Sequence, residues 1–238
     1  LGRALQIEFP YAECVDRSVF DMSDPAIITS RNWRAYETII NAAAYTAVDL
    51  AETEGRHDAW LSNATAVSYL ARIAIQNNLT LVHVSSDYVF DGTHTNHLDT
   101  ELFTPINVYG ESKAAGDIAA AMVPKHYIAR TSWVIGDGNN FVSTMKSLAE
   151  KGVAPSVVND QVGRLTFTSD LARGIKHLVN SDAEHGTSNL TNDGESVSWA
   201  DIAADVFELT GHDRNAVTGV STKEDYAGKE GIAPRPLQ

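Results

Sequence analysis

The chain has 238 residues, of which 43% are hydrophobic and 21% are charged. This is a globular composition, long enough for one large α/β domain or for one domain with a smaller lobe. The formal charge of −13 argues against nucleic-acid and anionic-membrane partners, because phosphate-rich surfaces attract clustered Lys and Arg.

Cysteine usage and hydropathy narrow the class further. Cys14 is the single cysteine, which excludes an intrachain disulfide and a cysteine-based metal cluster. The sequence shows no apolar run long enough to span a membrane and no signal peptide. The simplest interpretation is a protein of the reducing cytoplasm.

The first part of the chain alternates short apolar runs with longer helical patterns. Residues 12–16 predict a strand, and residues 24–36 predict a helix with Asp24 as its N-cap. A helix is expected over 57–77, where apolar residues recur at helical spacing. Further strands are predicted at 37–44, 79–86 and 125–133. Strand, helix and strand in repetition indicate crossover units and a mostly parallel sheet.

After about residue 150 the pattern loosens. Short strands are expected near 154–158 and 186–190, and helices near 168–180 and 198–211. We therefore predict an α/β fold with a doubly wound, mostly parallel Rossmann-type sheet in residues 1–150 and a smaller lobe in residues 151–238. The boundary is approximate, because the chain is expected to interweave the two parts.

The N-terminal residues look like the end of a glycine-rich turn that is already entering a helix. In a doubly wound sheet the first strand lies in the middle, and without it the backbone groups of its neighbours would be unpaired. We therefore expect that the first strand and most of the glycine loop precede Leu1 in a longer natural polypeptide.

The segment Val108-Tyr109-Gly110-Glu111-Ser112-Lys113 contains a candidate proton-transfer pair. Side chains four residues apart lie on the same face of a helix. A nearby ammonium favours the phenolate, so Lys113 is expected to lower the pKa of Tyr109 from its ordinary value of about 10. Such a pair is a tunable acid or base. The same spacing occurs by chance in many helices, and alone it favours an ordinary surface helix.

Polar and small residues at three predicted strand ends give the pair a context. Ser85 and Ser86 end one strand, Asn41 and the alanines after it end another, and Arg130-Thr131-Ser132-Trp133 ends a third. In open α/β sheets, ligands bind at the carboxyl ends of the strands. A single ligand pocket, formed by these three strand ends and the Tyr109/Lys113 pair, explains the residues better than independent chance occurrences do.

These motifs carry a family resemblance. NAAAYTAVDLAETE, SSDYVF, PINVYGESKAAGD, RTSWVIG with GNNF, and VVNDQVGRLT, in this order, resemble the extended short-chain dehydrogenase/reductases, and within them the dTDP-4-dehydrorhamnose reductases. The resemblance covers most of the chain. It implies an NAD(P)-binding domain in 1–150, a substrate-binding lobe in 151–238, and NAD(P)H-dependent reduction of the 4-keto group of a dTDP-linked 6-deoxy sugar, dTDP-4-dehydro-L-rhamnose.

The resemblance also implies roles for individual residues. Tyr109 would donate a proton to the C4 oxygen, Lys113 would hold the nicotinamide ribose, and Ser86 would supply the catalytic hydroxyl. The implied substrate-binding residues are Asp87, Trp133, Asn139 and Asn140. Tyr226 and Arg235 are separate, weaker candidates that would face the diphosphate of the sugar nucleotide. The implied cofactor-binding residues are Gly2, Asp16, Arg17, Ala42, Ala43, Ala44, Ser85, Tyr109 and Lys113.

The cofactor preference stays open between NADH and NADPH. Asp16 would accept a hydrogen bond from a ribose 2′-hydroxyl and repel a 2′-phosphate, whereas Arg17 would attract that phosphate. A solvated turn explains either residue equally well, and dual use is the expectation.

Metal binding has two candidate regions. His94 and His97 lie three residues apart in a polar loop, but without a third ligand at a fixed distance they do not predict a metal site. Asp49, Glu52 and Glu54 form an acidic patch. The resemblance implies that such carboxylates can bind a divalent ion such as Mg²⁺ at a dimer contact, although a solvated helix face is the safer interpretation.

Alternatives to the reductase remain. A related epimerase or dehydratase would share the fold, but a dehydratase needs an added pair of acids after the catalytic hydroxyl, and here Asp87 is followed by Tyr88. A non-catalytic, cofactor-binding regulatory relative is the third possibility. A homodimer, and a second pathway domain fused before Leu1, also stay open.

Overall fold

The computed structural model describes residues 1–94, 96–181 and 183–236. Its helices are α1 (Gly2–Glu8), α2 (Pro25–Ser30), α3 (Val48–Ala51), α4 (Arg56–Trp60), α5 (Ala66–Asn77), α6 (Val108–Ala121), α7 (Phe141–Glu150), α8 (Thr168–Asn180), α9 (Trp199–Leu209) and α10 (Thr222–Tyr226). Its strands are β1 (Thr38–Asn41), β2 (Thr80–Ser86), β3 (His126–Thr131), β4 (Val134–Ile135), β5 (Ser156–Val158), β6 (Val162–Gly163), β7 (Thr166–Phe167), β8 (Gly186–Asn189), β9 (Val197–Ser198) and β10 (Thr218–Val220).

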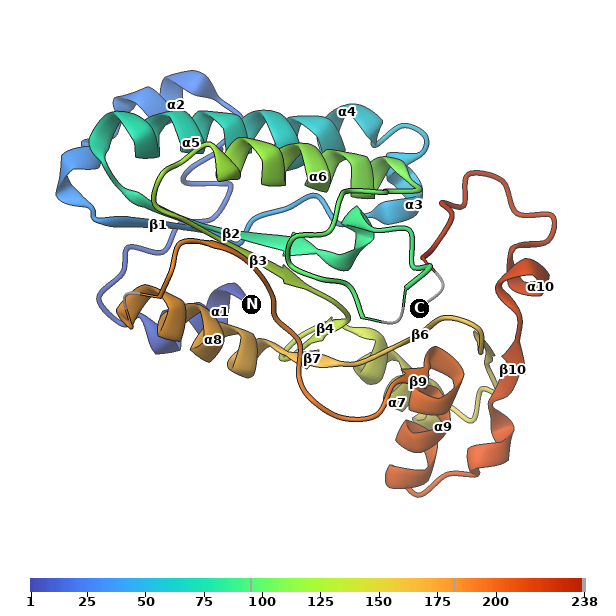
Figure 1. Ribbon diagram of the computed structural model, residues 1–238. Coiled ribbons are helices and arrows are strands. Elements are labelled where there is room, and N and C mark those ends of the chain that lie inside the picture. The colour runs from blue at the N-terminus through green and yellow to red at the C-terminus, as the bar shows by residue number, and fades with distance from the viewer. Residues whose placement is uncertain (95, 182, 237–238) are drawn as a thin grey trace.

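Within the described residues, the main sheet has four parallel strands in the order β1-β2-β3-β8. Helices α2, α5 and α6 lie on one face of it, and α1 and α8 lie on the other (Figure 1). The α/β class and the mostly parallel sheet predicted from the sequence are confirmed.

Side chains along each strand point alternately to the two faces of the sheet, and they form one apolar layer on each face. Leu81 and Ile128 point into the cluster beneath α5, whereas Val82 and Tyr127 point into the cluster formed with α1 and α8. Successive strand residues face opposite sides of a sheet, so a parallel strand covered on both faces is apolar throughout.

A group of elements that we call the lobe, built from β4, α7, β5, β6, β7, β9, α9, β10 and α10, packs beside this sheet and contains three two-stranded ladders, β10-β5, β4-β7 and β6-β9, among the described residues. Its core lies between α7 and α9 and includes Met145, Val157 and Val206. The chain returns from the lobe to the main sheet, because α8 covers one face and β8 pairs with β3. Figure 1 shows the lobe at the lower right.

Two predicted elements differ from the structure. Residues 12–16 form no strand, because they are exposed and pair with no strand in the described part of the chain. The predicted helix over 24–36 ends at Ser30 and is followed by a 3₁₀ turn at Trp33–Ala35. Its start is confirmed, since the Asp24 carboxylate accepts a hydrogen bond from the Ala26 N–H at 2.8 Å.

The other predicted strands and helices are confirmed with shifts of a few residues. The helix predicted over 57–77 is divided into α4 and α5 by a π-helical turn at Leu61–Thr65. None of the helices in the described residues combines the length and the apolar character that a bilayer crossing requires.

Candidate active site

Helix α6 begins at the carboxyl end of β2, and two side chains fix its first turn. The Asn107 side chain accepts a hydrogen bond from the Gly110 N–H at 2.7 Å, and the Glu52 carboxylate accepts one from the Val108 N–H at 2.8 Å. The first N–H groups of a helix have no partner within it, so these bonds stabilise the helix start. They also hold Tyr109, in the same turn, at a fixed position.

The structure brings Ser86, Tyr109 and Lys113 together at this strand end. The Lys113 ammonium donates a hydrogen bond to the Val84 carbonyl of β2 at 2.8 Å. The Ser86 hydroxyl donates to Asp87 Oδ1 at 2.9 Å and accepts from the Tyr88 N–H at 3.2 Å. All three side chains are buried. The spacing of Tyr109 and Lys113 on α6 is as predicted, and the structure adds that Lys113 reaches the end of β2.

The direction predicted for the pKa of Tyr109 is wrong. Burial raises the pKa of Tyr109 to about 12. The hydrogen bond between Ser86 and Tyr109 lowers this pKa, whereas the negative charges of Asp87 and Asp117 raise it. Burial also lowers the pKa of Lys113 to about 8. Both shifts have the same cause, since a low-dielectric site disfavours whichever form is charged. Tyr109 is thus a protonated phenol at neutral pH.

A buried ionic group that the sequence analysis missed lies behind this pair. Asp117 follows Lys113 by four residues on α6, and its Oδ2 accepts a hydrogen bond from Arg130 Nε at 2.9 Å. His83 Nε2 lies 3.6 Å from Asp117 Oδ1, and His83 Nδ1 lies 3.1 Å from Asn41 Nδ2. Burial, and then the charge of Lys113, hold the pKa of His83 well below its usual range.

Asp117 therefore balances two buried cations, Lys113 and Arg130, while His83 stays neutral. The signal that could have found it is the repeat Tyr109-Lys113-Asp117, three residues at four-residue spacing on one helix face. Its partner Arg130 lies on β3, and no local pattern connects that strand to α6.

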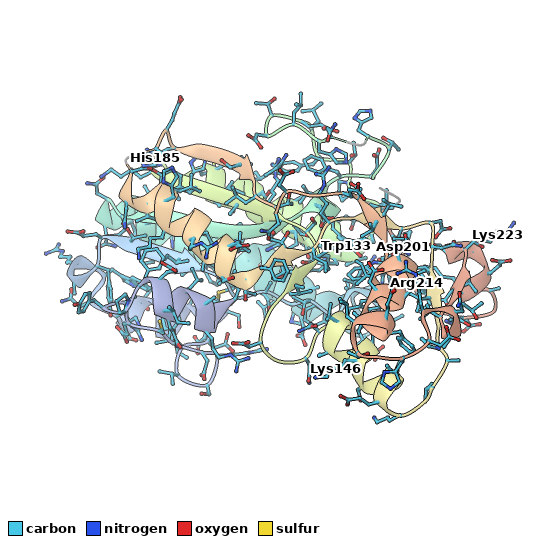
Figure 2. All side chains as sticks on the ribbon, turned by 90° about the horizontal axis from the view of Figure 1, so that it is seen from below. Trp133, Lys146, His185, Asp201, Arg214 and Lys223 are labelled. Carbon is cyan, nitrogen blue, oxygen red and sulfur yellow. The ribbon has the colours of Figure 1, made fainter. Side chains whose placement is uncertain are left out.

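The implied substrate residues Asp87 and Trp133 line one small cavity together with Tyr88, Gln161, Val162 and Pro236. Burial raises the pKa of Asp87 to about 6. Trp133 has a left-handed backbone with φ of 45°, and its ring stacks on Trp199 at 3.7 Å between centroids. Figure 2 shows Trp133 beside the segment that carries Asp201.

A glycine makes room for the Trp133 ring. A Cβ atom at Gly163 would lie 2.8 Å from the ring carbon Cε2, which is too close for a real contact. Sequence reasoning did not single out Gln161, whose amide donates hydrogen bonds to Thr222 Oγ1 at 3.1 Å and to the Tyr226 hydroxyl at 3.3 Å. Tyr226 thus contacts a residue that lines the cavity.

The loop with Asn139 and Asn140 has a structural explanation. Asn140 is the N-cap of α7: its side chain accepts a hydrogen bond from the Ser143 N–H at 3.0 Å, and Ser143 Oγ accepts one from the Asn140 N–H at 3.0 Å. Its amide also donates to the carbonyls of Gly136 and Gly138. The neighbouring loop carbonyl of Asp137 accepts from Arg3 of α1 at 2.8 Å.

The implied cofactor residues divide into two groups. Gly2 begins α1 in open space, and Ala43 and Ala44 are exposed directly after β1, so both regions leave the backbone approachable. Asp16 and Arg17 are instead used within their own turn. The Asp16 carboxylate accepts hydrogen bonds from Ser18, and Arg17 pairs with Asp21 at 3.1 Å.

The acidic patch is engaged elsewhere. Asp49 pairs with Arg235 at 2.7 Å and accepts a hydrogen bond from the Ala233 N–H, which also accounts for the position of Arg235. Glu52 holds the start of α6, and Glu54 accepts a hydrogen bond from Thr53. These three carboxylates form no ligand cluster in the described part of the chain, and a Mg²⁺ site among them is not supported.

The sequence of the chain is similar to a known family and to several proteins of known function. The family model described as "RmlD substrate binding domain" matches residues 1–237. A dTDP-4-dehydrorhamnose reductase from Aggregatibacter actinomycetemcomitans is 42% identical over 178 residues, covering 71% of this chain and 60% of that protein. One from Salmonella typhimurium is 42% identical over 197 residues, covering 79% and 65%. The alignments thus span 60% and 65% of the length of these two relatives.

Solved structures give the same result. A dTDP-4-dehydrorhamnose reductase from Bacillus anthracis in complex with NADP superposes with a TM-score of 0.86 at 32% identity, covering 98% of this chain and 84% of that one. One from Clostridium acetobutylicum gives a TM-score of 0.87 at 35% identity, covering 100% and 83%. The chain therefore belongs to the RmlD substrate binding domain family, together with the dTDP-4-dehydrorhamnose reductases.

Proposed function

We propose that this chain carries the catalytic part of a reductase that converts the 4-keto group of dTDP-4-dehydro-L-rhamnose to the hydroxyl of dTDP-L-rhamnose, using NADPH or NADH. The observation that carries the proposal is a protonated, buried Tyr109 beside Ser86 and Lys113 at a strand end. The names of the relatives, and the NADP in the Bacillus anthracis structure, support the substrate and the cofactor.

The residues present fit a dinucleotide. The open space at Gly2 and the exposed Ala43 and Ala44 after β1 leave the backbone approachable, and the buried Lys113 ammonium lies near the carboxyl end of β2. When bound, the nicotinamide supplies the hydride that reduces C4. We propose that the main sheet, with the helices on its two faces, binds the cofactor and that the lobe binds the substrate.

The proton is the part of the reaction that this chain supplies. A phenol with a pKa of about 12 holds its proton at neutral pH, so Tyr109 is ready to donate it to the C4 oxygen as negative charge develops there. The Ser86 hydroxyl would donate a second hydrogen bond to that oxygen in place of Asp87. The Lys113 ammonium favours the phenolate left on Tyr109, and its own charge is lost as the pH rises through about 8.

The residues that line the small cavity between the sheet and the lobe are the proposed contacts of the sugar, which itself needs a wider opening than this cavity. Asp87 and Gln161 offer polar groups there, and the Trp133 ring offers an apolar wall. Since the ring is held by Trp199 and by the space at Gly163, the lobe determines where the sugar can lie.

The test is steady-state oxidation of NADPH with dTDP-4-dehydro-L-rhamnose by the natural polypeptide that carries this sequence. Tyr109→Phe should lower kcat by about 10²- to 10⁴-fold, the usual range for a lost general acid, with NADPH affinity little changed. Tyr11→Phe is the matched control, because Tyr11 is fully exposed, and it should keep wild-type kcat. A Tyr109→Phe enzyme as active as the control would overturn the proposed mechanism.

A further inference from the structure

The loop between β2 and α6 contains a side-chain cluster that the proposed reaction does not use. Residues 97–99 of this loop are fixed to the main sheet. The Asp99 carboxylate accepts a hydrogen bond from the Asn189 N–H at 2.7 Å, and its carbonyl accepts one from Arg130 at 3.2 Å. The Asn189 amide also donates to the His97 carbonyl at 2.8 Å. This part of the loop is thus anchored to β3 and β8.

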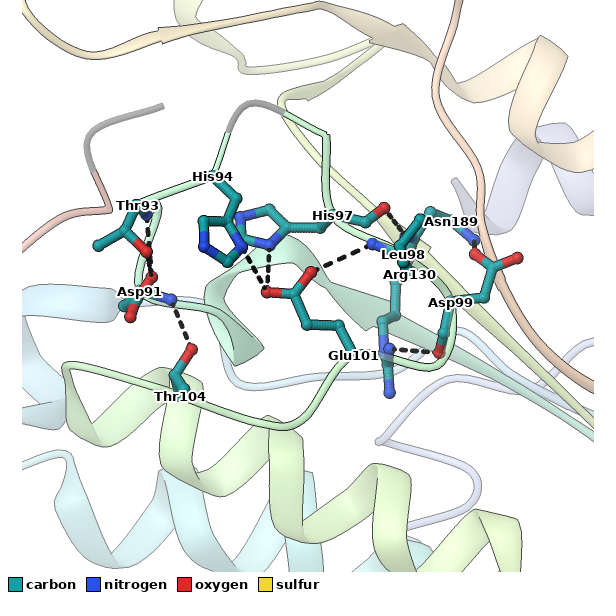
Figure 3. A network of polar contacts seen from close by, with 10 residues as sticks. All are labelled: Asp91, Thr93, His94, His97, Leu98, Asp99, Glu101, Thr104, Arg130 and Asn189. Carbon is teal, nitrogen blue, oxygen red and sulfur yellow. Dashed lines mark hydrogen bonds and ion pairs between the residues drawn. The ribbon is translucent and has the colours of Figure 1, made fainter.

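Two imidazoles and one carboxylate converge in this loop. His97 Nδ1 lies 3.0 Å and His94 Nδ1 lies 3.3 Å from the same oxygen, Glu101 Oε1. The other oxygen, Oε2, accepts a hydrogen bond from the Leu98 N–H at 3.2 Å, which turns Oε1 toward both rings. Figure 3 shows the two rings directed at the Glu101 carboxylate. Glu101 is the third ligand that the sequence analysis lacked.

The spacing of these atoms suits a metal ion. Zinc binds nitrogen and carboxylate oxygen at about 2.0–2.1 Å, so two ligand atoms of a tetrahedral site lie about 3.3–3.4 Å apart. Two of the three separations, 3.0 and 3.3 Å, are already close to that length, and all three ligand atoms lie within 4.8 Å of one another. The third separation is the one between the ligand nitrogens of His94 and His97. The His94 side chain is 67% exposed, so rotation of its ring can shorten this distance.

The surroundings position one ligand firmly and leave one adjustable. The His97 ring stacks flat on Phe90, with centroids 4.2 Å apart, and its side chain is only 9% exposed. The His94 side chain is instead 67% exposed, so its ring can turn toward a bound ion.

We propose that His94, His97 and Glu101 bind one divalent transition-metal ion, of the class that includes Zn²⁺ and Co²⁺, with water completing the coordination. Two imidazoles and one carboxylate suit these ions, whereas Mg²⁺ and Ca²⁺ prefer oxygen ligands throughout. Residues 97–99 are already hydrogen-bonded to Arg130 and Asn189 of the sheet. The bound ion would therefore connect His94 and Glu101 to this anchored part of the loop.

The test is a titration of the natural polypeptide with Co²⁺, followed by visible absorption, and with Zn²⁺, followed by calorimetry. We expect one ion per chain, and excess Mg²⁺ should not displace it. His94→Ala and Glu101→Gln should each weaken binding at least tenfold. Neither residue belongs to the proposed catalytic set, so NADPH-dependent turnover in the presence of a chelator should be unchanged in both variants.

His57→Ala is the matched control, because His57 is an exposed histidine on α4. It should bind the ion like the wild type. The proposal is overturned if no stoichiometric binding is seen, if His94→Ala and Glu101→Gln bind as tightly as the wild type, or if His57→Ala weakens binding equally. Because the readout is metal binding, this result is independent of whether the reductase assay succeeds.

Discussion

The buried site between β2 and α6 differs from the rim formed by loops and by the lobe. Tyr109, Lys113 and Asp117 lie on one helix face, are buried, and act on one another through a low-dielectric interior. At the rim, Asp16, Arg17 and Asn140 are exposed or half-buried and bond within their own turns. The comparison shows that a charged side chain has the largest effect on the energy of its neighbours where it is buried, because water does not screen it there.

The largest effect on stability is expected from Asp117→Asn. It leaves Arg130, which is 5% exposed, and Lys113 without their shared negative charge. Breaking a buried ion pair from one side typically costs about 3–5 kcal/mol. Urea unfolding at pH 7 measures the loss. Because the charge of Asp117 raises the pKa of Lys113, the variant should also lose activity at a lower pH than the wild type.

The control for Asp117→Asn is Asp205→Asn, which removes a partner of Arg214 in an exposed ion pair of the lobe. Both members of that pair are about half exposed, and such pairs contribute about 0–1 kcal/mol. Equal losses of stability in the two variants would show that burial of the Asp117–Arg130 pair does not increase its contribution to stability.

Asp87→Asn should act in the opposite direction on stability. The pKa of Asp87 rises from 3.8 to about 6 on folding, so the folded protein retains the proton more strongly. The cost of the buried charge is therefore fully present above pH 6 and absent below about pH 4. A shift of about two units corresponds to about 3 kcal/mol. The variant should gain up to that amount at pH 7 and nothing at pH 4 in urea unfolding.

The asparagine keeps an oxygen that can accept the Ser86 hydrogen bond, so the variant isolates the charge. A stability gain that is the same at pH 4 and pH 7 would show that the burial of the carboxylate is not its cause.

The smallest effect is expected from Asn140→Ala. The variant removes the cap of α7, which typically costs about 0.5–2 kcal/mol. If Asn140 acts as a cap, thermal unfolding should detect this loss while the KM for the nucleotide sugar stays unchanged. A raised KM with unchanged stability would instead support the role in substrate binding that the resemblance implies.

Several features could be predicted from the sequence because they depend on neighbours along the chain. The spacing of Tyr109 and Lys113 fixed them on one helix face, Asp24 and Pro25 marked a helix start, and apolar runs indicated the strands at 79–86 and 125–133.

The tertiary structure decided what depends on burial and on contacts distant in sequence. Residues 12–16 have strand-like composition but pair with no described strand, and burial raises the pKa of Tyr109. Asp117 meets Arg130 across two elements, and loop folding turns Glu101 toward His94 and His97. Local spacing fixes which residues share a face, whereas packing decides what each face contacts and how far water reaches it.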